Sequence, residues 1–225
     1  MKGRLAWVIV GAVSTVIMIL TAGSSLWFLT SYDQHNQSTR TTRYSIAQHG
    51  GRLDQLTVQL SSGDITVVEG PAGQVAVTGM LYWTSTKPVI DEYWDKGELN
   101  IDQGCPTGLF DQNCSVSIKV AVPPGVPLHL TTGSGDVTTV AVRSSNVQAN
   151  SGDGDLRLDF AATPTQVNAQ TGSGDVTVTV PPGATYVVAA DADNGTPTVE
   201  VTRDPGAPRS ITAQSGNGDV TIEYR

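Results

Sequence analysis

The chain has 225 residues, enough for one domain or two small ones, and its formal net charge is −8, with 13 Lys and Arg against 21 Asp and Glu. Lys2 and Arg4 precede a long uncharged segment, so all other basic residues and every acidic residue follow it. This acidic balance disfavours nucleic acid and anionic membrane surfaces as partners, because no basic stripe is present to neutralise phosphates.

The first predicted element is a membrane anchor. Residues 5–32 contain no charged side chain, and a helix of about 20 apolar residues spans the hydrocarbon core of a bilayer. Trp7 and Trp27 lie near the two ends, where their rings suit the membrane interfaces. We therefore predict a single transmembrane helix over residues 5–30.

The flanking charges predict the orientation of this helix. Lys2 and Arg4 lie before it and Asp33 after it, which places a cytoplasmic tail of residues 1–4 inside the plasma membrane and the rest of the chain outside. A cleaved signal peptide, with the small residues 21–24 as its cleavage region, is the alternative.

The chain outside the membrane is predicted to be all-β. Residues 31–43 are polar without apolar periodicity, which is typical of a flexible stem. From residue 44 to 225 the apolar residues fall in short alternating runs such as "LTVQL", "VSIKVAV" and "VTVTV", broken by Gly, Pro, Asn and Asp.

Two aromatic pairs follow one another 11 residues apart: Tyr82 with Trp83, and Tyr93 with Trp94. If all four rings are exposed together, they form a candidate ligand platform that stacks on sugar rings or inserts into a partner surface. The alternative is that they fill the wider end of a core that is otherwise rich in Gly and Ala.

Cys105 and Cys114 are the only cysteines, and they enclose the loop "PTGLFDQN". Two thiols this close in a polar loop outside the membrane predict a disulfide. Nothing in the sequence brings His49 or His129 to them as further metal ligands.

One Gly-Asp turn recurs along the chain, with flanking Val-x-Ala and Val-x-Val segments that also recur. The steps are 19 residues from Asp136 to Asp155 and 20 from Asp155 to Asp175. The next step falls near Asn194-Gly195, a degenerate copy, and a 24-residue step from there reaches the last turn. The aspartates of these turns are Asp64, Asp136, Asp155, Asp175 and Asp219.

A period near 20 residues is the signature of stacked units, each with two short strands, a corner and a return. We therefore predict a β-solenoid or β-helix-like exterior domain, with a β-sandwich as the alternative. Residues 122–225 are its regular part and residues 44–121 an irregular capping part.

The repeated turn has two interpretations. Gly-rich turns that end in Asp resemble calcium-binding repeats, but calcium needs six to eight oxygen ligands, and only Asp153 and Asp155 bring two carboxylates to one turn. The favoured interpretation is a structural corner, in which Gly adopts positive φ and Asp bonds to turn backbone. The weak calcium candidates are Asp136, Asp153, Asp155 and Asp175.

Catalytic signatures are missing from the sequence. It contains no serine nucleophile motif, paired-histidine metal motif or phosphate loop, and Arg143, Arg157, Arg203 and Arg209 are scattered. We expect no enzymatic activity and no cofactor.

The segments "VPPGVPLHLTTGSGDVTTVAV", "VQANSGDGDLRL" and "VNAQTGSGDVTVTV" resemble the bacterial putative-adhesin family of β-strand repeat proteins (DUF4097), over about residues 52–225. The resemblance implies a repetitive β fold in an envelope-associated protein and supplies no catalytic residues. The degenerate unit near residue 194 and the cysteine loop depart from the family pattern.

We therefore expect a membrane-anchored cell-surface protein that acts as a non-enzymatic, adhesin-like binding or scaffolding module. Its expected partners are the membrane, through the N-terminal helix, and a cell-wall glycan or a surface or membrane protein. The alternative function is an accessory component of envelope sensing or stress signalling that acts through a membrane partner.

Overall fold

The computed structural model describes residues 36–84, 86–105 and 114–225. The predicted transmembrane helix lies outside the described residues, and none of the helices within them is long and apolar enough to span a bilayer. The chain divides into two compact units, residues 1–36 and 37–225, and the second unit is described below.

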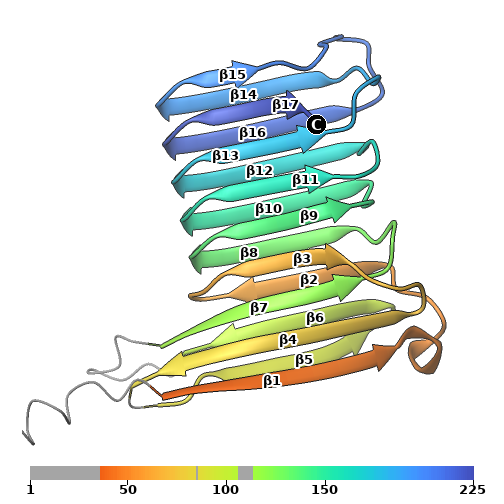
Figure 1. Cartoon of the computed structure of the whole chain (residues 1–225), viewed down its shortest axis with the longest axis vertical. Coiled ribbons are helices and arrows are strands. Elements are labelled where there is room, and N and C mark those ends of the chain that lie inside the picture. The colour runs from red at the N-terminus through yellow and green to blue at the C-terminus, as the bar shows by residue number, and fades with distance from the viewer. Residues whose placement is uncertain (1–35, 85, 106–113) are drawn as a thin grey trace, which may run out of the picture. The chain divides into compact units, whose positions relative to one another are not determined.

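Short strands make up almost all of this unit, and one 3-10 helix is the exception (Figure 1). The elements are β1 (Asn36–Ser45), η2 (Ile46–His49), β2 (Gln55–Leu60), β3 (Ile65–Glu69), β4 (Gln74–Trp83), β5 (Val89–Asp95), β6 (Glu98–Gly104), β7 (Cys114–Val122), β8 (Leu128–Ser134), β9 (Val137–Val142), β10 (Asn146–Asp153), β11 (Leu156–Phe160), β12 (Gln166–Ser173), β13 (Val176–Val180), β14 (Val187–Asn194), β15 (Pro197–Val199), β16 (Ser210–Asn217) and β17 (Val220–Tyr224).

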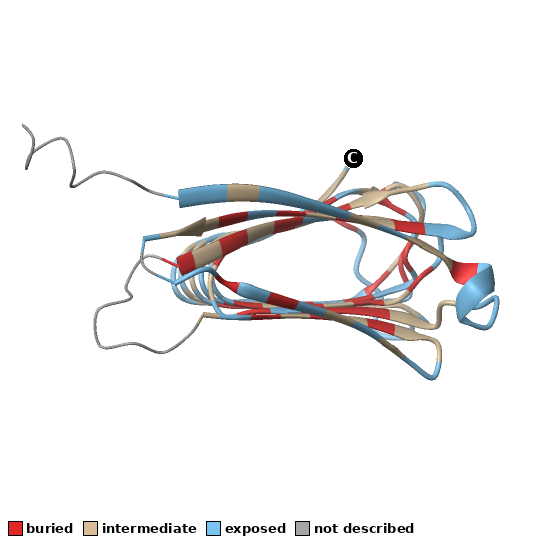
Figure 2. Ribbon diagram, turned by 90° about the horizontal axis from the view of Figure 1, so that it is seen from below, coloured by how far each residue is buried: buried red, intermediate tan, exposed pale blue. Residues whose placement is uncertain are grey.

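The strands form two sheets that lie as two layers (Figure 2). Sheet A has nine strands in the order β1-β4-β7-β3-β9-β11-β13-β17-β15, and sheet B has eight in the order β14-β16-β12-β10-β8-β2-β6-β5. A unit such as β10 and β11 contributes one strand to sheet B, turns at a Gly-Asp corner, and contributes the next strand to sheet A. We call each such unit a rung. The predicted all-β, solenoid-like fold is confirmed.

Neighbouring rungs pair in parallel and without a shift at the corners. Ala149 of β10 pairs with Ala169 of β12, and Leu156 of β11 pairs with Val176 of β13. Because the period along a strand is two, this register aligns every second side chain toward the space between the sheets. The inward Val, Ile, Leu and Ala side chains form one continuous core of almost fully buried residues.

The order of the last two rungs differs from the order of their sequences. β16 pairs with β12 on one side and with β14 on the other. The C-terminal rung, β16–β17, therefore lies between β12–β13 and the degenerate rung, β14–β15, which occupies the end of the stack. The expected step from Asp175 to the Asn194-Gly195 corner is wrong, because the corner next to Asp175 in space is that of Asp219.

The irregular region at the other end combines parallel and antiparallel pairs. β4 runs antiparallel to β7, and β5 runs antiparallel to β6. Residues 36–43, predicted as part of a flexible stem, instead form most of β1, which pairs with β4 in sheet A. Arg40 of this strand lies 3.5 Å from Glu92 of sheet B, so polar and ionic contacts compensate for its lack of apolar periodicity.

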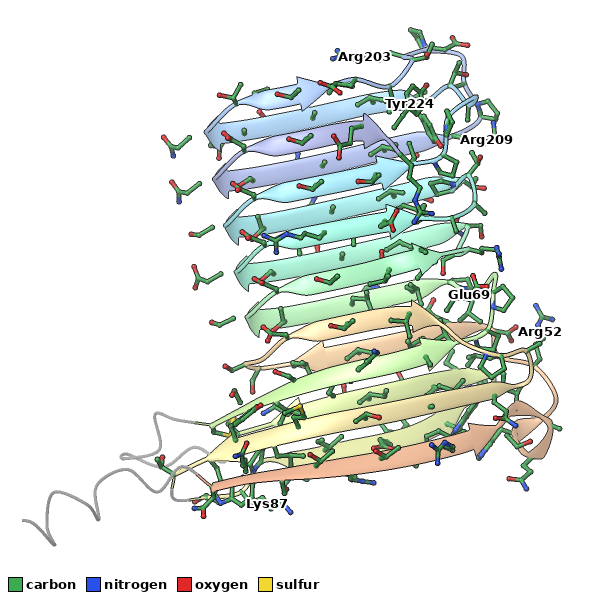
Figure 3. All side chains as sticks on the ribbon, in the orientation of Figure 1. Arg52, Glu69, Lys87, Arg203, Arg209 and Tyr224 are labelled. Carbon is green, nitrogen blue, oxygen red and sulfur yellow. A yellow bond between two sulfur atoms is a disulfide. The ribbon has the colours of Figure 1, made fainter. Side chains whose placement is uncertain are left out.

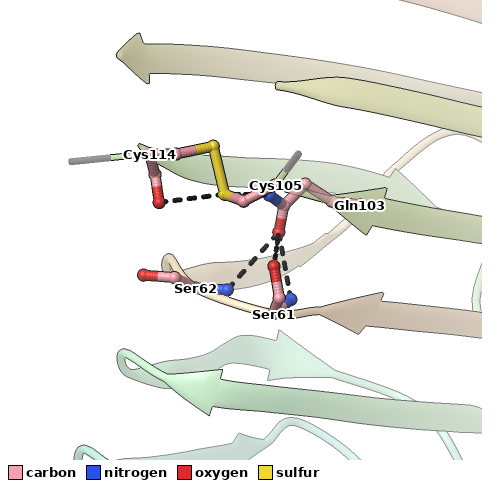
Figure 4. The surroundings of a disulfide bond; sticks show 5 residues. All are labelled: Ser61, Ser62, Gln103, Cys105 and Cys114. Carbon is pink, nitrogen blue, oxygen red and sulfur yellow. Dashed lines mark hydrogen bonds between the residues drawn. A yellow bond between two sulfur atoms is a disulfide. The ribbon is translucent and has the colours of Figure 1, made fainter. Parts of the chain in front are cut away.

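The predicted disulfide joins Cys105 and Cys114, with their Cα atoms 5.9 Å apart (Figure 4). It lies where β6 passes to β7, the position that a Gly-Asp corner takes in the regular rungs. Gln103 fixes this corner to the next rung, because its Oε1 accepts hydrogen bonds from Ser61 N at 3.0 Å and Ser62 N at 3.4 Å.

Candidate functional site

The Gly-Asp corners form a column on one side of the stack, and each aspartate bonds to the next rung. The Oδ1 atom of each carboxylate accepts a hydrogen bond from the backbone N–H of the following corner. The donor–acceptor pairs are Asp136 N to Asp64 at 3.1 Å, Asp155 N to Asp136 at 2.9 Å, Asp175 N to Asp155 at 2.8 Å, Asp219 N to Asp175 at 2.8 Å, and Thr196 N to Asp219 at 2.8 Å.

The series ends at the degenerate rung. Thr196 occupies the position of the aspartate there, and no further rung follows it in the described part of the chain. A carboxylate at this corner would have no N–H of a following rung to accept. The loss of the Gly-Asp sequence near residue 194 is thus explained by its place in the stack.

Hydroxyl groups complete the same corners. Ser151 donates to Gly135 O at 2.9 Å, Thr171 to Gly154 O at 2.8 Å, and Ser215 to Gly174 O at 2.7 Å. Side chains thus satisfy buried polar groups of the backbone on both sides of each corner. The repeated turn is a structural device that ties one rung to the next.

The weak calcium candidates lie along this column, and the carboxylates of Asp136, Asp155 and Asp175 have other partners. Besides the N–H bonds described above, Arg157 lies 2.6 Å from Asp155 and 3.6 Å from Asp136. Within residues 36–84, 86–105 and 114–225, no three His, Cys, Asp or Glu side chains come close enough to hold one metal ion. Asp153 precedes the Gly154 corner at the end of β10.

The four aromatic residues of the predicted platform do not form one surface. Tyr82 and Trp83 belong to β4 in sheet A, whereas Tyr93 and Trp94 belong to β5 in sheet B. Trp83 and Trp94 pack against the core, and Lys87 lies 5.4 Å from the Trp83 ring. Tyr93 is the most accessible of the four, with 49% of its surface exposed.

Trp94 belongs to a cluster that holds β1 and η2 against sheet B. Its ring stacks on His49 with centroids 4.4 Å apart, and Tyr44 meets its edge at 6.0 Å. The Tyr44 hydroxyl donates to Glu92, whose side chain is only 3% exposed. Burial raises the pKa of Tyr44 to about 12, and the hydrogen bond to Glu92 adds to the shift. These contacts give the cluster a structural role.

The outer face of sheet B has a different chemistry. The outward positions of β10, β12 and β16 are mostly Asn and Gln, and register places them side by side on neighbouring strands. We call this surface the amide face. Its amide residues are Asn146, Gln148, Asn150, Gln166, Asn168, Gln170 and Gln214.

Two hollows lie on the amide face. The larger, about 460 Å³, is lined by residues of β10, β12, β14 and β16 that include Asn150, Gln170, Gln214, Asp191 and Asp193. Its floor contains Gly172 and Gly216, where a Cβ would come within 2.6 Å of a glycine carbonyl oxygen on the neighbouring rung. Close approach of the rungs thus requires glycine here, and the missing side chains leave the surface open.

The smaller hollow, about 260 Å³, is lined by His129, Gln148, Gln166 and Asn168, among others. The Oδ1 atom of Asn168 is buried and has no hydrogen-bond partner within the described residues. A buried amide oxygen without a donor is uncommon in folded proteins.

Charge is distributed unevenly around the stack. None of the eight strands of sheet B contains Lys or Arg, whereas sheet A has Lys119 and Arg157 on its outer side. Figure 3 shows Arg52, Arg203 and Arg209 on the side opposite the Gly-Asp corners, where the rungs return. The amide face is therefore polar but free of cationic groups.

The amide face was not predicted from the sequence. The signal was present as alternating amides in "NVQAN" and "QVNAQ", immediately before the Gly-Asp turns. Period-two strands predict that these residues share a face, but only the register of the rungs shows that they adjoin one another.

Comparisons with known proteins agree with this architecture. The family model described as Toastrack DUF4097 matches residues 125–225. No curated protein matches the sequence.

Among solved structures, a putative cell adhesion protein from Clostridium sporogenes has a TM-score of 0.60 at 15% identity, covering 84% of this chain and 100% of its own. A putative adhesin from Bacteroides fragilis has a TM-score of 0.38 at 14% identity, covering 84% and 97%. The first of these likenesses shows a shared fold. The resemblance predicted from the repeated turns is confirmed by the family-model match, which covers residues 125–225.

Proposed function

We propose that the chain is a membrane-anchored cell-surface protein, and that the amide face is the binding surface of a non-enzymatic, adhesin-like module. The observation that supports this most is the pair of hollows on the amide face, lined by side chains that offer both donors and acceptors. Ligand sites are typically concave and contain a few convergent polar groups.

The location rests on the sequence. The uncharged segment of residues 5–32, with Lys2 and Arg4 before it, supports a helix that crosses the plasma membrane with its N-terminus in the cytoplasm. The repeat unit then lies outside the cell, where a disulfide such as Cys105–Cys114 persists. The name of the solved structure that shares the fold, a putative cell adhesion protein, agrees with a binding role.

One observation favours the alternative role in envelope sensing. β1, the first described strand, is joined to sheet B through Arg40 and Tyr44, which both contact Glu92. A pull on the chain before Asn36 would act directly on this strand. In this role the chain would act through a partner in the membrane.

Co-sedimentation with envelope fragments of the host cell tests the proposal. We expect saturable binding of the full chain, and a loss of about tenfold in affinity for Gln170→Ala/Gln214→Ala, which removes two neighbouring amides of the larger hollow. The matched control is Thr177→Ala/Thr221→Ala, which alters the same two rungs on sheet A. Equal binding by both double variants would contradict a binding role for the amide face.

A further inference from the structure

Register aligns the outward residues of sheet B in rows that cross every strand. One row begins at Tyr93 on β5 and ends at Ala189 on β14, and its members in order are Tyr93, Asn100, Thr57, His129, Gln148, Asn168, Thr212 and Ala189. The adjacent row is Asp91, Asp102, Gln59, Thr131, Asn150, Gln170, Gln214 and Asp191. The smaller hollow includes members of the first row and the larger hollow members of the second.

The length of these rows favours a polymer over a small ligand. Eight strands at a spacing of about 4.8 Å give each row a length of about 34 Å. The two hollows share β10 and β12 and extend from there in opposite directions along the stack. A polymer that lies across the strands would contact both hollows at once, and this raises its overall affinity above that of a ligand bound in one hollow.

The charge pattern selects an uncharged polymer. The middle of the second row is made of amides and hydroxyls, with Asp91 and Asp102 at one end and Asp191 at the other. The middle of the first row has the same chemistry except for His129. Because sheet B contributes no Lys or Arg from its strands, an anionic polymer would meet carboxylates without a compensating cation. Each amide in the middle can both donate to and accept from a hydroxyl group.

An exposed aromatic ring ends the first row. Tyr93 is 49% exposed, and its hydroxyl is held by Asp102 of the adjacent strand, whose charge raises the pKa of Tyr93. An amphipathic ring fixed at one polar end presents an apolar face to a ligand. Tyr93 is thus the one residue of the predicted aromatic platform that lies in a row with the amides.

We propose that the amide face binds an uncharged polyhydroxylated polymer, a neutral glycan, that lies across the strands of sheet B, in contact with both hollows and with Tyr93. This inference rests on the proposed function and adds the chemical class and the direction of the ligand. The hydroxyl groups of the glycan bond to the amides of the two rows that line the hollows.

The test compares β-1,4-linked glucans and glucosamine oligomers of different charge. The full chain, solubilised in a detergent without a sugar headgroup, is titrated with hydroxyethyl cellulose as the neutral probe, carboxymethyl cellulose as the anionic probe and chitosan oligomers as the cationic probe. Dextran and mannan extend the neutral set to other linkages. We expect binding to at least one neutral polymer, with the anionic probe bound at least about tenfold more weakly than the neutral one.

Variants locate the site. Gln148→Ala/Asn168→Ala in the smaller hollow and Gln170→Ala/Gln214→Ala in the larger should each weaken neutral-polymer binding by about tenfold, and Tyr93→Ala by a smaller factor. The control Thr177→Ala/Thr221→Ala should bind like the unaltered chain. Short oligomers that reach only one hollow should bind more weakly than the polymer.

Failure of this inference can be told apart from failure of the proposed function. If envelope binding depends on Gln170 and Gln214 but no neutral polymer binds, or a charged probe binds more tightly, the neutral-glycan inference is overturned and the binding face stands. If envelope binding is insensitive to every amide variant, both are overturned.

Discussion

The corner column and the amide face are both repeated polar series, and they differ in where their hydrogen bonds go. At the corners, Asp155 accepts from the N–H of Asp175, and Thr171 donates to the Gly154 carbonyl, so each polar group bonds to the neighbouring rung. Among the seven amides that define the amide face, only Gln170 and Gln214 form a side-chain hydrogen bond between rungs, at 2.9 Å, in the described part of the chain. The other amides of this face border hollows or solvent.

This difference shows that repetition alone does not identify a binding site. The Gly-Asp turn is the most conspicuous motif in the sequence, and its polar groups are engaged inside the molecule. The less conspicuous alternation of Asn and Gln leaves hydrogen-bonding capacity available to a partner. Substitutions at the corners should therefore change stability, and substitutions on the amide face should change binding.

The largest effect on stability is expected from Gly154→Ala. Gly154 has φ of +150°, and a Cβ there would lie 2.1 Å from the Gly135 carbonyl oxygen in the middle of the stack. We expect a loss of about 3 kcal/mol or more in the free energy of unfolding, measured by urea denaturation. Gly183→Ala is the control, because Gly183 has φ of +96° but open space where a Cβ would lie. This variant should lower the free energy of unfolding by about 1–2 kcal/mol. Equal losses for the two variants would show that the close approach of neighbouring corners contributes nothing to the requirement for glycine.

The disulfide corner should come next. Cys105→Ser/Cys114→Ser removes the link that replaces a Gly-Asp corner between β6 and β7. Loop-entropy arguments for a closed loop of this size predict a loss of about 2–3 kcal/mol. Comparing chemical denaturation of the oxidised chain, the reduced chain and the double variant checks this. An unchanged midpoint would mean that Gln103 and its bonds to Ser61 and Ser62 suffice to hold the corner.

A smaller loss is expected from Asp175→Ala, which removes the acceptor of the Asp219 N–H. We expect about 1 kcal/mol, the net contribution of a typical hydrogen bond, because both residues are exposed and water can bond to the freed N–H. Thr196→Asp introduces a carboxylate at the end of the same column, where no following rung offers an N–H. That variant should change the free energy of unfolding by less than about 0.5 kcal/mol. A larger stabilisation by Thr196→Asp would mean that a further partner lies beyond the degenerate rung.

The smallest effect on stability is expected on the amide face. Gln170→Ala/Gln214→Ala removes two exposed side chains whose hydrogen bond within the described part of the chain is the one they make with each other. The free energy of unfolding, measured by thermal denaturation, should stay within about 0.5 kcal/mol of that of the unaltered chain. A loss comparable to that of Asp175→Ala would show that these amides are structural and would weaken the case for a binding surface.

Much of the fold followed from local patterns. Alternating runs such as "VTVTV" predicted strands, and the 20-residue step between Asp155 and Asp175 predicted adjacent rungs. The position of the last rung could not be predicted from these patterns. It depends on the pairing of β16 with both β12 and β14, and this long-range pairing leaves no periodic signal in the sequence. The strand at residues 36–43 was missed because side-chain contacts such as Arg40 with Glu92 connect it to residues about 50 positions away.

Less of the candidate site than of the fold could be predicted from the sequence. The predicted aromatic platform grouped residues that are close in sequence: Tyr82, Trp83, Tyr93 and Trp94. The first pair lies in sheet A and the second in sheet B. Gln170 and Gln214 are 44 residues apart and lie on adjacent strands. Surfaces of a solenoid are assembled across rungs, so neighbours on the surface are seldom neighbours in the sequence.

The most direct test of the account measures unfolding and envelope binding together on two variants, Asp175→Ala and Gln170→Ala/Gln214→Ala. The account predicts that Asp175→Ala lowers the unfolding midpoint and leaves the affinity of the folded chain unchanged. It predicts the opposite for the amide variant, with an unchanged midpoint and an affinity about tenfold weaker. If both variants change the same property, the division between a structural corner column and a binding amide face is contradicted.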